Sequence, residues 1–146
     1  MISSFESNAL ALVVQGGGRV VKTLGDSVMF VSDHAVKAAT IGLTLAEVFE
    51  DETLGVPPVH VGIAYGPALT RAGDVFGAAV NIASRATSVA RPNTVVIDRG
   101  LAEVLAEDSR FALRKLRPQR VRGYENLQVD VRRLAAADAA GACSCI

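Results

Sequence analysis

The stretch that most constrains the fold of this chain runs from Arg19 to Phe30 and reads RVVKTLGDSVMF. Two short runs rich in β-branched residues flank a Gly-Asp pair at residues 25–26. Such runs favour strands, and the pair between them favours a tight turn, so the stretch predicts a β-hairpin. Lys22 lies just before the turn and Asp26 lies in it, so a basic and an acidic side chain flank the turn closely.

The composition is that of one globular domain. The chain has 146 residues, of which 50% are hydrophobic, enough to bury a core. Its 15 basic and 15 acidic residues cancel, which does not favour a general nucleic-acid or anionic-membrane surface. The only cysteines, Cys143 and Cys145, lie in the last four residues and cannot cross-link a core. No membrane-spanning run or signal sequence is evident, so we expect a cytoplasmic location.

The rest of the chain alternates between helical and strand patterns. We expect helices at 3–14, 33–50, 77–90 and 98–106, with Ser32 or Asp33 capping the second and Asp98 capping the last. Strands are expected at 59–65, 94–97, 111–116 and 129–134, with a weaker one at 68–74. This order gives an α/β or α+β chain, and it favours an α+β fold with a ferredoxin-like βαββαβ core. We expect one domain over 1–134 and a flexible tail over 135–146.

Lys22 and Asp26 are the first candidates for chemistry. A spacing of four would suit a helical ion pair, but the valines and Gly25 argue against a helix there. From these residues alone, a turn aspartate beside a solvated strand lysine is as good an interpretation as a functional site.

Asn81 and Arg85 form a second candidate pair, in the segment VNIASR that follows Asp74. They are four apart on an expected helix and so project from one face. Asparagine is a poor residue inside a helix because it competes for backbone hydrogen bonds. A ligand explains the pair more easily than the helix does, although a solvated polar face remains an alternative.

A basic cluster near the end of the chain is the third candidate. It suits phosphate oxygens, and its alternative is a solvated edge that discourages strand pairing. Its members are Arg114, Lys115, Arg117, Arg120 and Arg122.

Four segments in order carry a family resemblance: VVKTLGDSVMFV, HVGIAYGPAL, GDVFGAAVNIASRATSVARPNTVVI and KLRPQRVRGYENLQVDVRRL. Together they resemble class III nucleotidyl cyclases, in particular the bacterial adenylate cyclase catalytic domain. The resemblance covers nearly the whole chain from Gly16 to Leu134. Each segment alone would be weak evidence for the family, but the presence of all four in order makes the resemblance specific.

The resemblance implies an activity and a role for each candidate. The activity is conversion of ATP to 3′,5′-cyclic AMP and pyrophosphate by two-metal catalysis with Mg²⁺ or Mn²⁺ at a dimer interface. Asp26 matches the second of two metal-binding aspartates. Asn81 matches the residue that orients the ribose, and Arg85 the one that stabilises charge at the α-phosphate. Arg122 matches a basic residue on the triphosphate.

Lys22 and Asp74 match the pair that selects the purine. Adenine offers an N6 amino donor and an N1 acceptor, which suit a carboxylate and an ammonium, whereas guanine presents the reverse pattern. The pair therefore argues for ATP over GTP. The resemblance also implies a head-to-tail homodimer, or a heterodimer with another cyclase chain, in which one subunit supplies the metal aspartates and the other supplies the remaining groups.

One family feature has no match in this sequence. The family has an earlier strand with a motif like F-x-D-x-x-x-F-T, whose aspartate bridges both metals. The nearest outlines, at Phe5-Glu6 and at Phe30 to Asp33, do not fit. We therefore expect an N-terminally truncated version of the fold that lacks a central strand and leaves sheet edges unpaired.

Three explanations of the missing motif remain open: a fragment of a longer cyclase, a degenerate homologue, or strand exchange between chains. Strand exchange would fill the gap. We favour a fragment or a degenerate homologue, and so expect an adenylate cyclase-like domain that is weak or inactive as this chain stands. The alternative function is a non-catalytic module that binds nucleotide or pairs with a complete cyclase. An unrelated ferredoxin-like domain is the third possibility, and four motifs in order argue against it.

Overall fold

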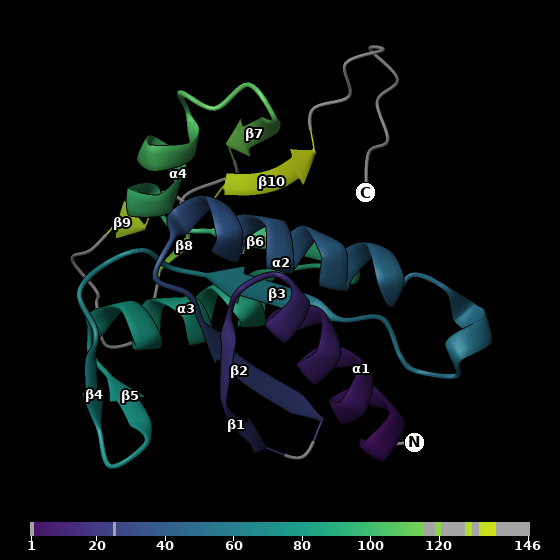
Figure 1. Cartoon of the computed structure of the whole chain (residues 1–146). Helices are drawn as coiled ribbons and strands as arrows, with labels where there is room; N and C mark the ends of the chain where they lie inside the picture. Colours follow the sequence, from purple (N-terminus) through teal and green to yellow (C-terminus); the bar gives the residue numbers. More distant parts are fainter. Residues whose placement is uncertain (1, 25, 116–118, 121–127, 130–131, 137–146) are drawn as a thin grey trace.

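The structure is a computed structural model that describes residues 2–24, 26–115, 119–120, 128–129 and 132–136. Four α-helices, one 3₁₀ turn and ten strands are described (Figure 1). In chain order they are α1 (Ile2–Gln15), β1 (Arg19–Leu24), β2 (Ser27–Val31), α2 (Ala35–Val48), the 3₁₀ turn η1 (Glu52–Leu54), β3 (His60–Ile63), β4 (Leu69–Arg71), β5 (Asp74–Phe76), α3 (Ala78–Val89), β6 (Thr94–Ile97), α4 (Arg99–Leu105), β7 (Phe111–Lys115), β8 (Gln119–Arg120), β9 (Gln128–Val129) and β10 (Arg132–Ala136).

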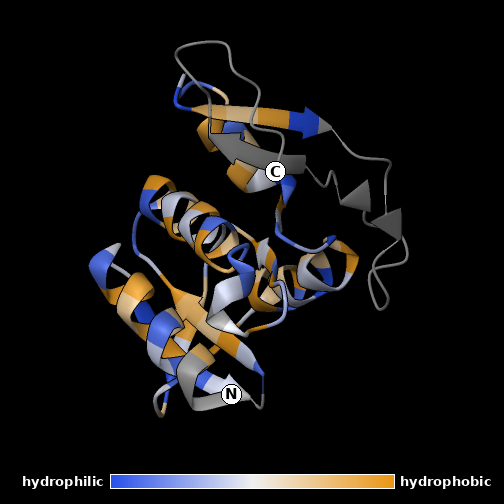
Figure 2. Cartoon of the chain, turned by 90° about the vertical axis from the view of Figure 1, so that its right-hand side faces the viewer, coloured by the Kyte–Doolittle hydropathy of each residue, from blue (hydrophilic) through white to orange (hydrophobic). Residues whose placement is uncertain are grey.

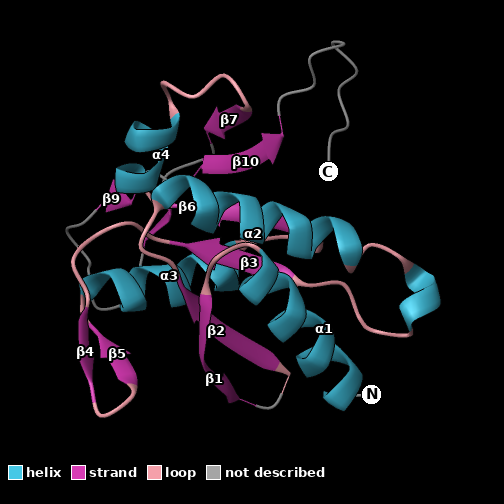
Figure 3. Cartoon of the chain, in the orientation of Figure 1, coloured by secondary structure: helices cyan, strands magenta, loops and turns pink. Residues whose placement is uncertain are grey.

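A four-stranded sheet in the order β3-β6-β10-β7 forms the centre of the fold. β3 and β6 are parallel, and α3 connects them, whereas β10 runs antiparallel to both β6 and β7. The β1–β2 hairpin, the β4–β5 hairpin and the β8–β9 pair are separate two-stranded sheets. Figure 3 shows this mixture of helices and strands, and the expected α+β class is confirmed.

β3 lies between two helices that approach it closely. On one face, a Cβ at Gly42 of α2 would lie 2.6 Å from the Ile63 side chain. On the other face, a Cβ at Gly62 would collide with the Thr87 backbone nitrogen and the Ala83 carbonyl oxygen of α3. Glycine at both positions therefore lets two helix backbones lie directly on the strand.

The hydrophobic core lies where α1, α2 and α4 meet the sheet. Its largest wholly buried side chains are Phe49, Ile41, Ile97, Leu101, Leu105, Val13, Val95 and Val96. The rings of Phe5 and Phe49 pack with centroids 5.3 Å apart. In Figure 2 the helices alternate between hydrophobic and hydrophilic segments, as expected for helices with one buried face.

Most expected elements are present, including the hairpin, the first helix, the helix over 77–90 and the strand over 94–97. Two local expectations were wrong. The single strand expected at 68–74 is a hairpin, because Ala72 (φ 52°) and Gly73 (φ 80°) make a tight turn between β4 and β5. Neither Ser32 nor Asp33 caps α2: its N-cap is His34, which makes no side-chain capping bond.

The strand edges bear on the expected truncation. Among the described residues, β3 pairs only with β6, and β1 and β2 pair only with each other. One edge of β3 thus has no described strand beside it. The absence of the family's first strand stays a prediction.

The end of the described chain also differs slightly from the expected boundary. β10 reaches Ala136, two residues beyond the expected end of the domain at Leu134, and residues 137–146 lie outside the described part. Within that part, no helix has both the length and the apolar character needed to cross a membrane.

The close contact of β3 with α3 predicts a strong effect of a single methyl group. Gly62→Ala places a Cβ against helix backbone that cannot rotate away, so we expect a loss of about 2 kcal/mol or more in the free energy of unfolding. Gly66→Ala is the control, because its Cβ would meet only the Ala79 methyl at 3.6 Å. Urea unfolding of both variants checks this, and equal stability of the two would contradict the packing described here.

Candidate functional site

An ion pair joins the β1–β2 hairpin to the β4–β5 hairpin. Lys22 Nζ of β1 donates to Asp74 Oδ2 of β5 at 3.0 Å, across 52 residues of sequence. Both side chains are partly exposed, 40% for Lys22 and 34% for Asp74. The structure therefore brings together the two residues that sequence analysis assigned to the purine.

Local structure explains how Asp74 is presented. It is the first residue of β5, and its neighbour Val75 is 4% exposed and anchors the strand. Because side chains alternate along a strand, Asp74 points to the face opposite Val75. Its second oxygen, Oδ1, accepts the Val75 backbone N–H at 2.8 Å.

The ion pair also sets the charge of the carboxylate. The hydrogen bond from Lys22 is the largest cause that lowers the pKa of Asp74 below its usual 3.8, and the bond from the Val75 N–H adds to it. Asp74 is therefore an ionised hydrogen-bond acceptor near neutral pH.

Asn81 and Arg85 lie on α3, which begins directly after β5. Both side chains are exposed, one turn apart on the helix, while Ala86 of the same helix is 3% exposed. The absence of a side chain at Gly62 allows this helix to pack closely against β3. Gly77, at the N-terminus of the helix, has φ 141°, a conformation that favours glycine. One continuous segment thus carries Asp74, Asn81 and Arg85.

Asp26 lies in the turn between β1 and β2 and is exposed. The partner of Lys22 is Asp74, so the helical ion pair with Asp26 that the spacing allowed does not form. Within the described part of the chain, no group of three or more His, Cys, Asp or Glu side chains could hold a metal ion. The described residues alone do not fit a two-metal site, because Mg²⁺ needs more oxygen ligands than one carboxylate offers.

The basic cluster is only partly described. Arg114 of β7 is exposed, and its backbone pairs with that of Arg133. Arg117 and Arg122, the latter predicted to bind the triphosphate, lie outside the described residues.

Sequence reasoning missed part of the role of Asp98. It was expected to cap α4, and its Oδ1 does accept the Leu101 N–H at 2.9 Å. The same oxygen also accepts the Tyr65 N–H at 3.1 Å, from a residue 33 positions away. No sequence pattern signals this second bond, since it depends on β3 and β6 lying side by side.

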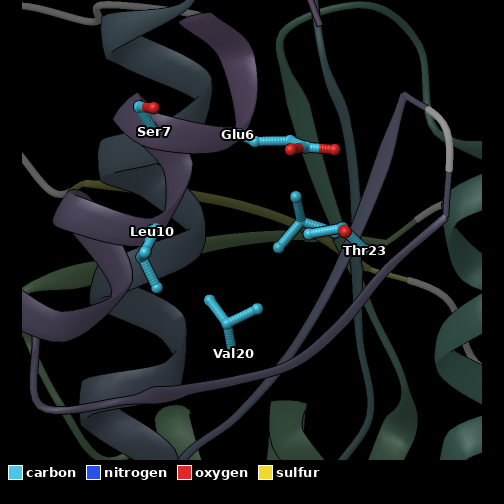
Figure 4. A pocket seen from close by; sticks show the side chains of 6 residues that line it. Glu6, Ser7, Leu10, Val20 and Thr23 are labelled. Atoms are coloured by element: carbon cyan, nitrogen blue, oxygen red, sulfur yellow. The ribbon is translucent and has the colours of Figure 1, made fainter. Parts of the chain in front are cut away.

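A separate cavity of about 200 Å³ lies between α1 and the β1–β2 hairpin (Figure 4). Its lining residues are Glu6, Ser7, Leu10, Val20, Thr23 and Val28. None of the predicted site residues lines it, so it is distinct from the site built around Lys22 and Asp74.

Comparison with known proteins yields consistent matches. Residues 2–131 match the profile of the adenylate and guanylate cyclase catalytic domain. An adenylate cyclase of Streptomyces coelicolor is 48% identical over 106 residues, 72% of this chain and 27% of that protein. An adenylate cyclase of Glutamicibacter nicotianae is 37% identical over 129 residues, 88% of this chain and 32% of that protein. The chain thus spans about a third or less of these relatives.

Solved structures show the same fold. The crystal structure of an adenylyl cyclase from P. aeruginosa superimposes with a TM-score of 0.78 at 18% identity, over 94% of this chain and 82% of that one. The expected cyclase-type fold is therefore confirmed.

The ion pair predicts the titration of Asp74. Its carboxyl carbon, followed by NMR, should titrate below 3.8, and Lys22→Gln should move the midpoint up towards 3.8. Since the pKa is lowered in the folded state, the stabilisation from this pair is present above pH 3.8 and is lost as the pH falls through the lower folded-state pKa. Asp108, whose pKa is about 2 beside Arg110, is the internal control. An unchanged Asp74 midpoint in Lys22→Gln would rule out the pair.

Proposed function

The chain belongs to the adenylate and guanylate cyclase catalytic-domain family, and on this premise we propose that it binds ATP and serves its conversion to 3′,5′-cyclic AMP and pyrophosphate. The observation that carries the proposal is the Lys22–Asp74 pair. A paired ammonium and carboxylate at a partly exposed position offer the donor and the acceptor that the adenine edge requires.

Recognition of adenine leaves the pair largely intact. Lys22 uses one of its three N–H donors on Asp74 and can direct another at adenine N1. Each oxygen of Asp74 accepts one bond and keeps a lone pair for the N6 amino group. Guanine would place its O6 acceptor against the carboxylate and its N1–H donor against the ammonium, and both contacts are repulsive. The pair therefore favours ATP over GTP.

Asn81 and Arg85 supply the next two functions of the site. We assign Asn81 to orienting the ribose and Arg85 to the negative charge that develops at the α-phosphate. Both lie on a helix whose backbone is packed against β3 at Gly62. A guanidinium carried on a rigid element is already in position when charge develops, so little reorganisation is needed in the transition state. Arg122 is assigned to the triphosphate.

Members of this family use Mg²⁺ or Mn²⁺ and act as dimers of nucleotide-binding domains. In this chain Asp26 is the only metal ligand that we assign, and it shares its hairpin with Lys22. We propose a head-to-tail homodimer, or a heterodimer with another cyclase chain, in which Asp26 serves one site and Lys22 serves the other. With the metal-binding half reduced to Asp26, we expect turnover by this chain alone to be weak or absent.

Removal of the purine-reading carboxylate tests the proposal. We expect Asp74→Ala to weaken ATP binding roughly 10-fold or more, the cost of a charged hydrogen bond, and to abolish the preference for ATP over GTP. Isothermal titration with ATP and GTP in the presence of Mn²⁺ measures this. Asp33→Ala, which removes an exposed carboxylate from a loop, is the control and should bind as the parent does. Equal loss in both variants would contradict the assignment of Asp74.

Arg85 is expected to act on turnover rather than on binding. In an ATP to cyclic AMP assay with Mn²⁺, Arg85→Lys should lower kcat roughly 10-fold or more with little change in KM, because the fixed fork of the guanidinium is lost while the charge remains. Arg91→Lys, at an exposed position just after the same helix ends at Val89, is the matched control. Strong turnover that Asp26→Ala abolishes would contradict the weak activity proposed here.

A non-catalytic partner module is the alternative, favoured by the lone carboxylate of Asp26. It would dimerise with a complete cyclase chain without binding nucleotide. Thermal unfolding with saturating ATP and Mn²⁺ separates the two: a rise in melting temperature supports nucleotide binding, whereas no shift supports the partner module.

A further inference from the structure

A buried carboxylate holds the root of the segment that carries Asp74. We name residues 66–77, which contain β4 and β5, the arm. Asp98, at the end of β6, is 7% exposed, and its Oδ1 accepts the backbone N–H of Tyr65, the residue before the arm, at 3.1 Å. The same oxygen accepts the Leu101 N–H at 2.9 Å, and the Asp98 backbone N–H donates to Ile63 O at 3.1 Å. One residue thus joins β3, α4 and the root of the arm.

Helix capping alone does not explain why this carboxylate is buried. Asp51 also caps a helix, the 3₁₀ turn η1, by accepting from Thr53, and it is exposed to solvent. Burial raises the pKa of Asp98, against the lowering effect of hydrogen bonds from backbone N–H groups, including those of Leu101 and Tyr65. Burying a carboxylate costs free energy, and the hydrogen bond from the Tyr65 N–H is a stabilising contact that burial at this position makes possible.

The start of the arm packs against the elements that position Asp74 and α3. After Tyr65 the chain passes Gly66, where an added Cβ would lie 3.6 Å from the Ala79 methyl in the first turn of α3. The carbonyl oxygen of Pro67 lies 3.1 Å from where a Cβ of Gly77 would be. The first two residues of the arm therefore pack against its last residue, Gly77, and against the first turn of α3. From the root, β4 sets the register of β5, in which Arg71 is opposite Asp74.

We propose that Asp98 is a positioning residue for purine recognition: by holding the Tyr65 amide, it fixes the arm so that Asp74 meets Lys22. This inference rests on the proposed function and extends it to a residue that does not touch the nucleotide. The Tyr65 carbonyl oxygen also lies close to Gly100 of α4, where an added Cβ would be 3.0 Å from it.

Asp98→Ser separates the two roles of the side chain. Serine still caps α4 through Leu101 but is too short to reach Tyr65 as well. We expect the dissociation constant for ATP, measured by isothermal titration with Mn²⁺, to rise roughly 10-fold and the ATP-to-GTP preference in binding to fall by a similar factor. Asp98→Asn keeps the accepting oxygen and should rescue both values. Asp51→Ser is the control, because it makes the same change at an exposed cap whose two hydrogen bonds both come from Thr53.

Amide hydrogen exchange gives a readout that needs no nucleotide. Asp98→Ser should speed exchange at Tyr65 and through the arm while Leu101 stays protected. If the parent chain neither binds nor converts ATP, the proposed function fails, and exchange still tests the positioning role. Arm exchange and nucleotide preference that both match Asp51→Ser would overturn the inference.

A second variant covers the case in which Asp98→Ser does not fold. Gly100→Ala leaves the carboxylate in place and displaces the Tyr65 carbonyl from the other side. It should reproduce the faster arm exchange and the reduced ATP preference. Parent-like exchange and preference in Gly100→Ala would also overturn the inference.

Discussion

The contact between β3 and α3 is the constraint on which the site depends. Gly62 has no side chain, so the backbone of α3 lies directly on the strand at Ala83 and Thr87. This contact fixes the helix that carries Asn81 and Arg85. It also fixes the end of the arm, because β5 runs into α3 through Gly77. The positions of three candidate residues thus follow from one glycine in the central sheet.

The Lys22–Asp74 pair does little for stability. Both side chains are more than a third exposed, and solvent screening leaves such surface pairs with little net contribution to stability. Yet the pair spans two hairpins that share no backbone hydrogen bonds among the described strands. A weak interaction held in place by stronger packing around it can exchange partners at low cost. That property suits a recognition site better than a structural bridge.

Much of the local structure could be predicted from sequence, because periodicity and turn residues are local signals. The valines on either side of Gly25 predicted the hairpin, and the helical pattern over 77–90 predicted α3. The turn at Ala72 was missed because alanine seldom adopts a positive φ. Residue patterns alone did not distinguish Lys22 and Asp26 from ordinary charged residues at a turn, and only the family resemblance pointed to Asp74. The second hydrogen bond of Asp98 depends on a tertiary contact that no local pattern records.

The two halves of the candidate site differ in how they are built. The purine half is assembled within one chain, from β1 and the continuous segment that joins β5 to α3, and the register of two hairpins holds it. Among the residues that the structure describes, the candidate metal half is represented by one exposed carboxylate at the β1–β2 turn, and hard divalent cations require several oxygen ligands. The proposed function therefore assigns nucleotide affinity and turnover to different parts of the molecule. In the proposed function, selection of ATP depends on the purine half of one chain, whereas chemistry at the α-phosphate requires further ligands around Asp26.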